Sequence, residues 1–480
     1  MKIHILLLLT LSILLGCENG TDSDGGYAYF GGEIVNPNND YVVLESPDQM
    51  LDTLYMDENN RFLKKLENFK GGLYTFLHGG EYQLLLLESS DSVMLRLNTI
   101  DFDESLVFTG KGARKNNYLI TSYLENESDN KKFMGMMWET EPEKFEQALD
   151  SNRNKKMAEL KEFMSDHEFT EYFKTIAETN INYNYNYNKE LYPFGYYGYN
   201  NLIHFKDLPS NFYDYRSTID YNNESLLSVI PYNRFLFWHF NNLALKKYYT
   251  KATHNVVFNK MSVPYNLEKL RLVDSLVENE AIKNHLLKYN TRDFISVSTD
   301  SLEISEVLES FLEKSDNDLD RAYMKDLAKA VNNLKPGNVV PTIMLLDRND
   351  NEVELKTLIS KPTVIYFWSS NLPLLLRNSH YKVGGLKQKF PEVDFIAINI
   401  NDDDKAHWID IIKKYNFNPI QEYRFSDPSE AMKQLALNSV NKSIFVNKDA
   451  RIVNANAMII TSEFEEELTH FLKRNKAYHK

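Results

Sequence analysis

The sequence predicts a multidomain protein of mixed α and β class. Three observations predict it. Short alternating apolar segments, separated by Asn, Asp and Gly, fill residues 27–113 and indicate a small antiparallel β-sandwich or barrel. Residues 114–333 repeat apolar positions at helical spacing, so a mainly helical region is expected there. Residues 334–480 alternate strand-like and helix-like segments, which is typical of an α/β domain with a parallel crossover.

The first 17 residues predict a lipoprotein signal peptide. Lys2 precedes an apolar run that suits a signal peptide and is short for a membrane span. The run ends at "LLGC", which resembles a lipobox, the site where bacterial lipoproteins are cleaved and acylated at cysteine. An ordinary secretory signal is the alternative. We expect a lipid anchor on Cys17, a polar tether over 18–26, and a cell-envelope location on the periplasmic or outer-membrane face.

Cysteine usage and charge exclude several functions. Cys17 is the only cysteine of the 480 residues, so its acylation would leave no thiol for disulfides, C-x-x-C chemistry or cysteine metal sites. The net charge is −14, and loss of Lys2 with the leader makes it −14 − 1 = −15. Such an acidic chain is not expected to bind nucleic acid.

The middle region combines helices with an unusual polar and aromatic stretch. Helical periodicity appears in 144–178, 266–289 and 305–334, and 230–250 reads as a buried helix. Between them, 180–201 is rich in Asn and Tyr. It predicts either an aromatic surface for peptide or glycan, or a packed helix followed by a loop broken at Pro193 and Gly195, and packing is favoured. The tyrosines concerned are Tyr183, Tyr185, Tyr187, Tyr192, Tyr196, Tyr197 and Tyr199.

The last segment begins after a Pro/Gly boundary, "LKPGNVVP" at 334–341. Unbroken apolar runs at 363–368 and 393–400 fit strands that are buried on both faces. Helices are expected up to about Phe390, through "AHWIDIIKKY", and from about Ser462 onward.

This last segment resembles the thioredoxin-like domain of TlpA-type thiol–disulfide reductases. "PTIMLLDRNDNEVELKTL" resembles the entry hairpin of the family, and "KPTVIYFWSS" resembles its central strand and active-site turn. "EVDFIAININD" and "SIFVNKDARIV" resemble the next strand and the late hairpin. The preceding regions resemble those that often precede such domains in Bacteroidetes-type envelope lipoproteins.

The active-site positions depart from the family. W-C-x-x-C is replaced by a turn without cysteine, and Asn441 stands where the family has a cis-proline. The resemblance therefore implies a degenerate, redox-inactive active site. In the family the groove at this turn receives extended polypeptide. Its counterpart here would be lined by Trp368, Ser369, Ser370, Asn371, Leu372, Val440, Asn441 and Lys442.

Other chemistry at the turn is less well supported by the sequence. Ser369 or Ser370 with His380 could form a nucleophile and a base, but no G-x-S-x-G elbow is present. Helix capping by Ser370 or Asn371 is the favoured alternative. The histidines are scattered, and the acidic groups at 347–352 and 402–404 read as turns or a helix start rather than calcium loops. No catalytic residue, metal or cofactor is expected.

The sequence thus predicts a non-catalytic cell-envelope lipoprotein that binds a protein, peptide or envelope ligand. Two alternatives remain open. One is a hydrolase that uses carboxylates, and the other is a structural accessory subunit of an outer-membrane assembly. Four Asp-Ser/Thr-apolar triplets, at 52–54, 91–93, 274–276 and 300–302, resemble an O-glycosylation sequence of Bacteroidetes envelope proteins.

Overall fold

The computed structural model divides the chain into two compact units, Met1–Thr121 and Ser122–Lys480. None of the helices in the described ranges combines the length and apolar character that a membrane crossing requires. Cys17, Tyr197, Tyr199, Asp403 and Asp404 lie outside the described residues. The structure describes residues 26–48, 50–196, 202–203, 208–249, 256–402, 405–417 and 421–477.

The first unit contains two four-stranded sheets, ordered β4-β1-β7-β8 and β3-β2-β5-β6. Phe30 of β1 packs on Phe76 of β5 with ring centroids 6.0 Å apart, so the core lies between the two sheets. The elements are β1 (Ala28–Val35), β2 (Tyr41–Glu45), β3 (Leu51–Tyr55), β4 (Arg61–Leu66), β5 (Gly72–His78), β6 (Glu81–Leu87), β7 (Ser92–Asn98), α1 (Phe102–Ser105) and β8 (Val107–Lys111).

This unit is not purely antiparallel, which corrects the sequence-based expectation. Strands β1 and β7 pair in parallel, with Tyr29 opposite Ser92 and Val35 opposite Asn98. Alternating apolar residues show that a strand has one buried face, but they do not specify the direction of its neighbour. The two strands are distant in sequence, so no hairpin turn sets their relative direction.

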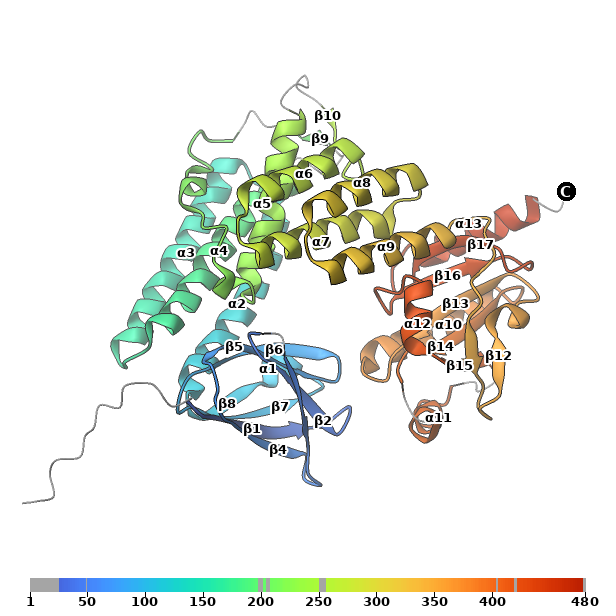
Figure 1. Ribbon diagram of the computed structural model, residues 1–480, viewed down its shortest axis with the longest axis horizontal. Helices are drawn as coiled ribbons and strands as arrows, with labels where there is room; N and C mark the ends of the chain where they lie inside the picture. Colours follow the sequence, from blue (N-terminus) through green and yellow to red (C-terminus); the bar gives the residue numbers. More distant parts are fainter. Residues whose placement is uncertain are drawn as a thin grey trace, which may run out of the picture. The chain divides into compact units, whose positions relative to one another are not determined.

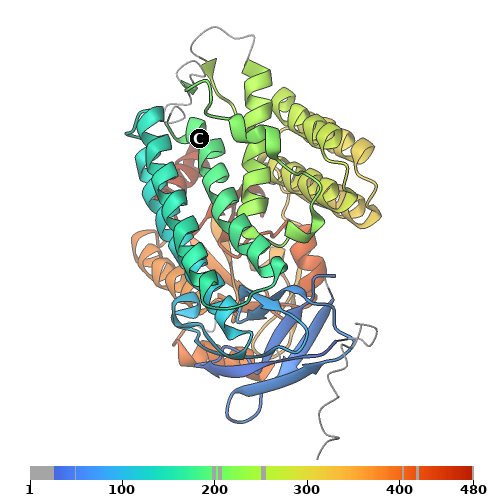
Figure 2. The same cartoon turned by 90° about the vertical axis from the view of Figure 1, so that its left-hand side faces the viewer.

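The helical region belongs mostly to the second unit, and α3, α4 and α5 run side by side in it (Figures 1 and 2). Side chains of Asn279, Asp300 and Asn317 cap α7, α8 and α9 by accepting backbone N–H groups of the first turn. The elements are α2 (Ala113–Met137), α3 (Pro142–Ser165), α4 (Glu171–Tyr196), β9 (Leu202–Ile203), α5 (Ile230–Tyr249), β10 (Val256–Val257), α6 (Val263–Leu276), α7 (Glu280–Val297), α8 (Ser301–Lys314) and α9 (Asp318–Asn333).

Residues 180–196 of the Asn/Tyr stretch lie in α4, and the two residue types contact different neighbours. Asn184 accepts a hydrogen bond from the side chain of Asn130 of α2 at 3.1 Å. Asn188 donates to the same side chain at 2.8 Å. Tyr183 instead packs edge-on against Tyr232 of α5, with ring centroids 4.9 Å apart. Packing therefore accounts for the described part of this stretch.

Helix α4 continues through Pro193 to Tyr196. The sequence instead favoured a loop broken at this proline. Proline in a helix removes one backbone hydrogen bond and disfavours the helical conformation. Tyr192 is fully buried beside it, stacks on Phe145 and donates to the backbone oxygen of Thr140 at 2.6 Å. These contacts hold the turn that contains the proline in place.

The C-terminal sheet has seven strands in the order β12-β11-β15-β14-β13-β16-β17. β13 is parallel to β14 and antiparallel to β16, which pairs in turn with β17. This order is the thioredoxin-like arrangement, visible in orange and red in Figure 1. The elements are β11 (Met344–Leu346), β12 (Glu352–Glu354), β13 (Thr363–Trp368), α10 (Pro373–Lys389), β14 (Asp394–Asn399), α11 (Lys405–Lys414), β15 (Glu422–Phe425), α12 (Pro428–Gln434), β16 (Lys442–Val446), β17 (Ile452–Met458) and α13 (Phe464–Ala477).

Candidate functional site

The candidate site lies where β13 leaves the sheet. Every residue of β13 is buried. Residues 369–372 form a turn that joins β13 to α10, which begins at Pro373. Tyr366 pairs with Ser443 of β16, so the same register, continued, places Asn441 opposite Trp368. Residues 369–372 and the loop before β16 therefore meet at one edge of the sheet.

The turn is closed by local hydrogen bonds. The Ser369 hydroxyl accepts from the backbone N–H of Asn371 at 3.2 Å. The backbone N–H of Ser370 donates to the Asn401 side chain, beyond β14, at 2.9 Å. These bonds use serine and asparagine to shape the turn.

Leu372 is the N-cap of α10, which corrects the expectation that Ser370 or Asn371 caps this helix. Its side chain has no polar atom, so the usual side-chain cap is missing. Pro373 fixes the first helical residue, because its ring holds φ near the helical value. The cap position is therefore set by the proline and not by the polar residues before it.

The eight residues predicted to line a groove divide into two groups. Trp368, Ser369 and Lys442 are buried, with 0%, 5% and 7% exposure, so these side chains lie beneath the surface. The other five are partly exposed and are called the turn surface below. The turn surface consists of Ser370, Asn371, Leu372, Val440 and Asn441.

Asn441 closes the loop before β16 through its side chain. Its Oδ1 accepts from the backbone N–H of Ile460, and its backbone oxygen accepts from Ile459, both at 2.9 Å. No peptide bond in the described ranges is cis. Asparagine thus fixes this loop by tying it to the end of β17.

Lys442 points into the domain and not toward the turn. Its Nζ donates to the backbone oxygens of Leu435 and Ala436, at 2.8 and 3.0 Å. These oxygens lie at the C-terminal end of α12, where the helix dipole favours a positive charge such as the Lys442 ammonium. Burial lowers the pKa of the Lys442 ammonium to about 8.

A buried polar group lies directly behind the turn. Trp368 Nε1 donates to Glu422 Oε2 at 3.0 Å, and His380 Nε2 lies 3.1 Å from Glu422 Oε1. His380 Nδ1 lies 2.8 Å from the backbone oxygen of Leu376. Because that oxygen only accepts, Nδ1 carries a hydrogen, and the His380–Glu422 contact needs one further proton.

Glu422 also affects Tyr366, which is buried beside it. Burial, with the charge of Glu422 adding to it, holds the pKa of the Tyr366 hydroxyl well above its usual range. Sequence reasoning noticed His380 but missed Glu422, since 42 residues separate them and no motif links the two. No strand was predicted at 422–425, so nothing in the sequence marked this carboxylate.

This geometry does not form a serine nucleophile with its base. Both nitrogens of His380 are engaged, by Leu376 and by Glu422, so neither points a lone pair at Ser369 or Ser370. The described residues contain no cluster of three His, Cys, Asp or Glu side chains that could hold a metal ion. At 347–352, Asp347 accepts from the N–H groups of Asn349 and Asn351 and shapes a turn.

The helical region holds a second buried ionic cluster. Glu190 is fully buried, 2.6 Å from His239 Nδ1, and forms an ion pair with Arg216. Burial alone would raise the pKa of Glu190, but the charges of His239 and Arg216 outweigh it and lower this pKa to about 2. Tyr215 also donates to the carboxylate, at 2.8 Å. Every oxygen of this carboxylate has a partner, as expected of a structural cluster.

Comparison with solved structures finds proteins that are similar to part of this chain. No protein-family model matches, and no curated protein matches significantly. A candidate thiol–disulfide oxidoreductase from Bacteroides vulgatus is 20% identical, with a TM-score of 0.26, over 29% of this chain and 98% of its own. The thioredoxin domain of a thiol–disulfide oxidoreductase from Bacteroides vulgatus is 16% identical, with the same TM-score and coverage.

A thiol–disulfide oxidoreductase from Bacteroides fragilis is 18% identical, with a TM-score of 0.23, over 28% of this chain and 98% of its own. These structure neighbours are similar to less than a third of the chain. The thioredoxin-like arrangement of β13, β14, β16 and β17 follows from the strand order of this chain itself.

Proposed function

We propose that the protein is a cell-envelope lipoprotein whose thioredoxin-like domain binds polypeptide and does not exchange thiols. Thiol–disulfide exchange needs one thiolate to attack and a second thiol to resolve the mixed disulfide. Residues 18–480 contain no cysteine, while the strand, the turn and the helix start at 363–373 are kept. Retention of this framework without its thiols is the observation that carries the proposal.

The chemistry of the turn surface favours a polypeptide as ligand. Its five residues are uncharged, so they offer amide and hydroxyl groups together with the apolar side chains of Leu372 and Val440. Extended polypeptide presents the same mixture of backbone hydrogen-bonding groups and side chains, and its backbone carries no net charge. The overall negative charge of −14 also disfavours nucleic acid as a partner.

Binding of a defined unfolded polypeptide tests this proposal. Fluorescent, reduced and carboxymethylated α-lactalbumin is titrated with the chain from residue 18 onward, and anisotropy is measured. Leu372→Arg places a charge on the turn surface and is expected to weaken binding by about tenfold or more. Tyr381→Arg is the matched control, because Tyr381 is 87% exposed on the same helix but away from the turn. Absence of binding, or equal loss in both variants, contradicts the proposal.

The membrane anchor is tested separately in cells. Metabolic labelling with an alkyne fatty acid is expected to label the wild-type chain and to leave Cys17→Ala unlabelled. The variant is also expected to leave the membrane fraction, while Ser23→Ala, in the polar segment that follows, is expected to behave as the wild type. Equal labelling of the two variants would rule out an anchor at Cys17.

A further inference from the structure

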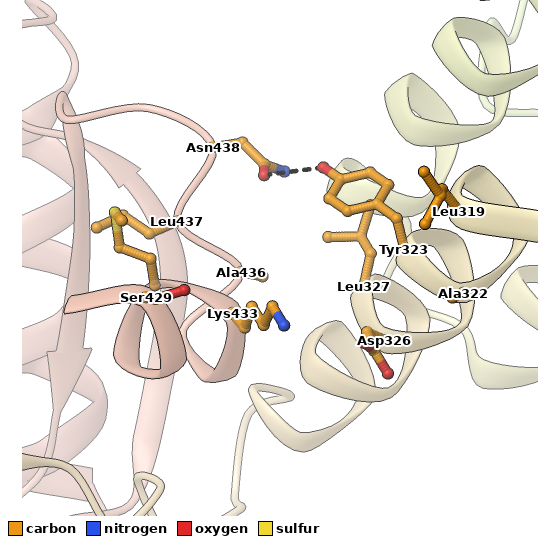
Figure 3. Close-up of a pocket in the computed structure, with 11 residues that line it drawn as sticks. Leu319, Ala322, Tyr323, Asp326, Leu327, Ser429, Lys433, Ala436, Leu437 and Asn438 are labelled. Carbon is orange, nitrogen blue, oxygen red and sulfur yellow. Dashed lines mark hydrogen bonds between the residues drawn. The ribbon is translucent and has the colours of Figure 1, made fainter. Parts of the chain in front are cut away.

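A cavity of about 410 Å³ opens between α9 and the segment from Ser429 to Asn438, both in the second unit (Figure 3). None of the turn-surface residues lines it. Its volume falls in the range of sites that bind small molecules. The cavity is called the α9–α12 pocket below.

The walls of the α9–α12 pocket are mainly apolar. Leu319, Tyr323 and Leu327 repeat at helical spacing and form one face of α9. Met432 and Leu437 form the opposite wall. Leu319 is 82% exposed, so an apolar side chain that is unusually open to water lies at the edge of the pocket.

Polar groups are placed at the edges of the pocket. Tyr323 donates its hydroxyl to Asn438 Oδ1 at 3.4 Å, and Figure 3 shows this bond joining the two walls. Asn438 also donates to Ser296 of α7 at 3.2 Å. Asp326 on α9 and Lys433 on α12 stand on opposite walls, with Lys433 reaching toward α9.

The two charges select against a ligand head of a single sign. An anionic ligand group near Lys433 would be repelled by Asp326, and a cationic group near Asp326 would be repelled by Lys433. A peptide unit suits both, since its N–H can donate to the carboxylate and its C=O can accept from the ammonium. The arrangement therefore fits a neutral, dipolar backbone that carries an apolar side chain.

The pocket is continuous in sequence with the turn surface. Ala436, Leu437 and Asn438 line the pocket, and Val440 follows two residues later on the turn surface. Lys442 holds the start of this segment by its bonds to Leu435 and Ala436. A polypeptide lying across the turn surface could therefore continue along this loop to the pocket.

We infer that the α9–α12 pocket receives a large apolar side chain of the polypeptide that binds at the turn surface. This inference rests on the proposed function and adds its specificity: segments with a Leu, Phe or Trp next to an extended stretch are preferred over polar ones. Burial of such a side chain in an apolar pocket is favourable because it removes apolar surface from water.

The first test uses single-residue probes and the methyl group of Met432. The chain from residue 18 onward is labelled at its Met methyl groups, and the Met432 signal is assigned with Met432→Leu. N-acetyl-L-tryptophanamide and N-acetyl-L-leucinamide are expected to shift this signal, whereas N-acetyl-L-serinamide is not. Shifts that avoid Met432, or that are equal for the three probes, overturn the inference.

The second test fills the pocket. Ala322 lines it, so Ala322→Trp is expected to abolish the Met432 shift and to weaken α-lactalbumin binding by about tenfold. Lys325→Trp is the matched control, because Lys325 is exposed on the same helix and does not line the pocket. Unchanged helix content and urea midpoint show that both variants fold.

The two proposals fail in different ways. If α-lactalbumin does not bind, or Leu372→Arg has no effect, the proposed function fails. If α-lactalbumin binds and Leu372→Arg weakens it, yet Ala322→Trp behaves as Lys325→Trp, the pocket is not part of the binding site and only the further inference fails.

Discussion

His380 Nε2 lies 3.1 Å from Glu422 Oε1, behind the turn that joins β13 to α10. The side chains are 8% and 4% exposed, and the His380 ring stacks on Phe417 with centroids 3.7 Å apart. Glu422 also accepts a hydrogen bond from the indole N–H of Trp368. One carboxylate therefore fixes the last residue of β13 and the helix that follows the turn.

Removal of this carboxylate is expected to destabilise the domain. Glu422→Leu leaves the buried N–H of Trp368 and the ring nitrogen of His380 without their partner, at a cost of about 3–5 kcal/mol. Glu422→Gln keeps hydrogen-bonding atoms and is expected to cost about 1–2 kcal/mol. Urea unfolding at pH 7, monitored by tryptophan fluorescence, measures both changes.

Glu392→Leu is the control for this comparison, because Glu392 is exposed just before β14. A loss in Glu422→Leu no larger than that of the control would mean that the buried pair contributes little. A native ¹⁵N spectrum with only one hydrogen-bonded nitrogen on His380 would contradict the contacts with Leu376 and Glu422.

The Glu190 cluster predicts stability that is lost in acid. The pKa of Glu190 is lowered from 4.5 to about 2, so its contribution is fully present above about pH 4.5. It disappears between pH 4.5 and 2, because the unfolded state then takes up the proton first. Glu190→Gln is expected to remove this part of the pH dependence and, by leaving Arg216 buried without its carboxylate, to cost about 3–5 kcal/mol at pH 7.

Urea midpoints measured from pH 7 to pH 3 test this expectation, with Glu171→Gln as the control. The side chain of Glu171 is 89% exposed at the start of the same helix. If wild type and Glu190→Gln lose stability in parallel over this range, Glu190 is not the group responsible.

Helical periodicity predicted the helical region well but not its breaks. Residues 266–289 read as continuously helical, yet α6 ends at Leu276 and α7 begins at Glu280. The break is made by Asn279, whose side chain accepts from the N–H of Ile282. A single Asn–backbone bond ends one helix and starts the next without changing the apolar spacing, so periodicity alone cannot locate it.

The strand and the helix that flank the candidate site were predictable from the sequence, but the buried contacts behind the turn were not. The apolar run at 363–368 and Pro373 locate the end of the strand and the start of the helix. Burial of Lys442 was not predictable, because a lysine after a loop is usually solvated. It depends on two backbone oxygens that α12 brings to it, which is a tertiary contact.

Lys442 predicts stability that increases at alkaline pH. Its pKa is lowered from 10.5 to about 8, so below pH 8 both states are protonated and the cost of burying the charge is fully present. Between pH 8 and 10.5 the unfolded state binds the extra proton, and stability rises by at most about 3 kcal/mol. Lys442→Met is expected to lack this rise, as measured by urea midpoints from pH 7 to 10.5.

Lys269 is also buried, with a pKa lowered to about 8, so part of the rise remains in the Lys442→Met variant. Lys448→Met, at an exposed position after β16, is the control and is expected to keep the full rise. Equal pH profiles for the two variants would show that the Lys442 ammonium is not protonated differently in the folded state.

Introduction of two thiols into the turn tests whether its geometry is that of a thioredoxin-like site. Leu372 is the N-cap of α10, where the helix N-terminus stabilises a thiolate, and Leu375 follows at C-x-x-C spacing. In the chain from residue 18 onward, Leu372→Cys/Leu375→Cys is expected to form an internal disulfide on oxidation. Its first thiol is expected to have a pKa below the usual value of about 8.5.

Iodoacetamide reactivity as a function of pH measures this pKa, and insulin reduction measures any recovered exchange. The control is Leu374→Cys/Arg377→Cys, which has the same spacing on the same helix but begins inside its first turn. If the two double variants react with the same pH profile, the start of α10 does not lower the pKa of a thiol at residue 372, as it would in a thioredoxin-like site. The turn would then not have the geometry of a thioredoxin-like site, and the proposed binding at the turn surface would need another explanation.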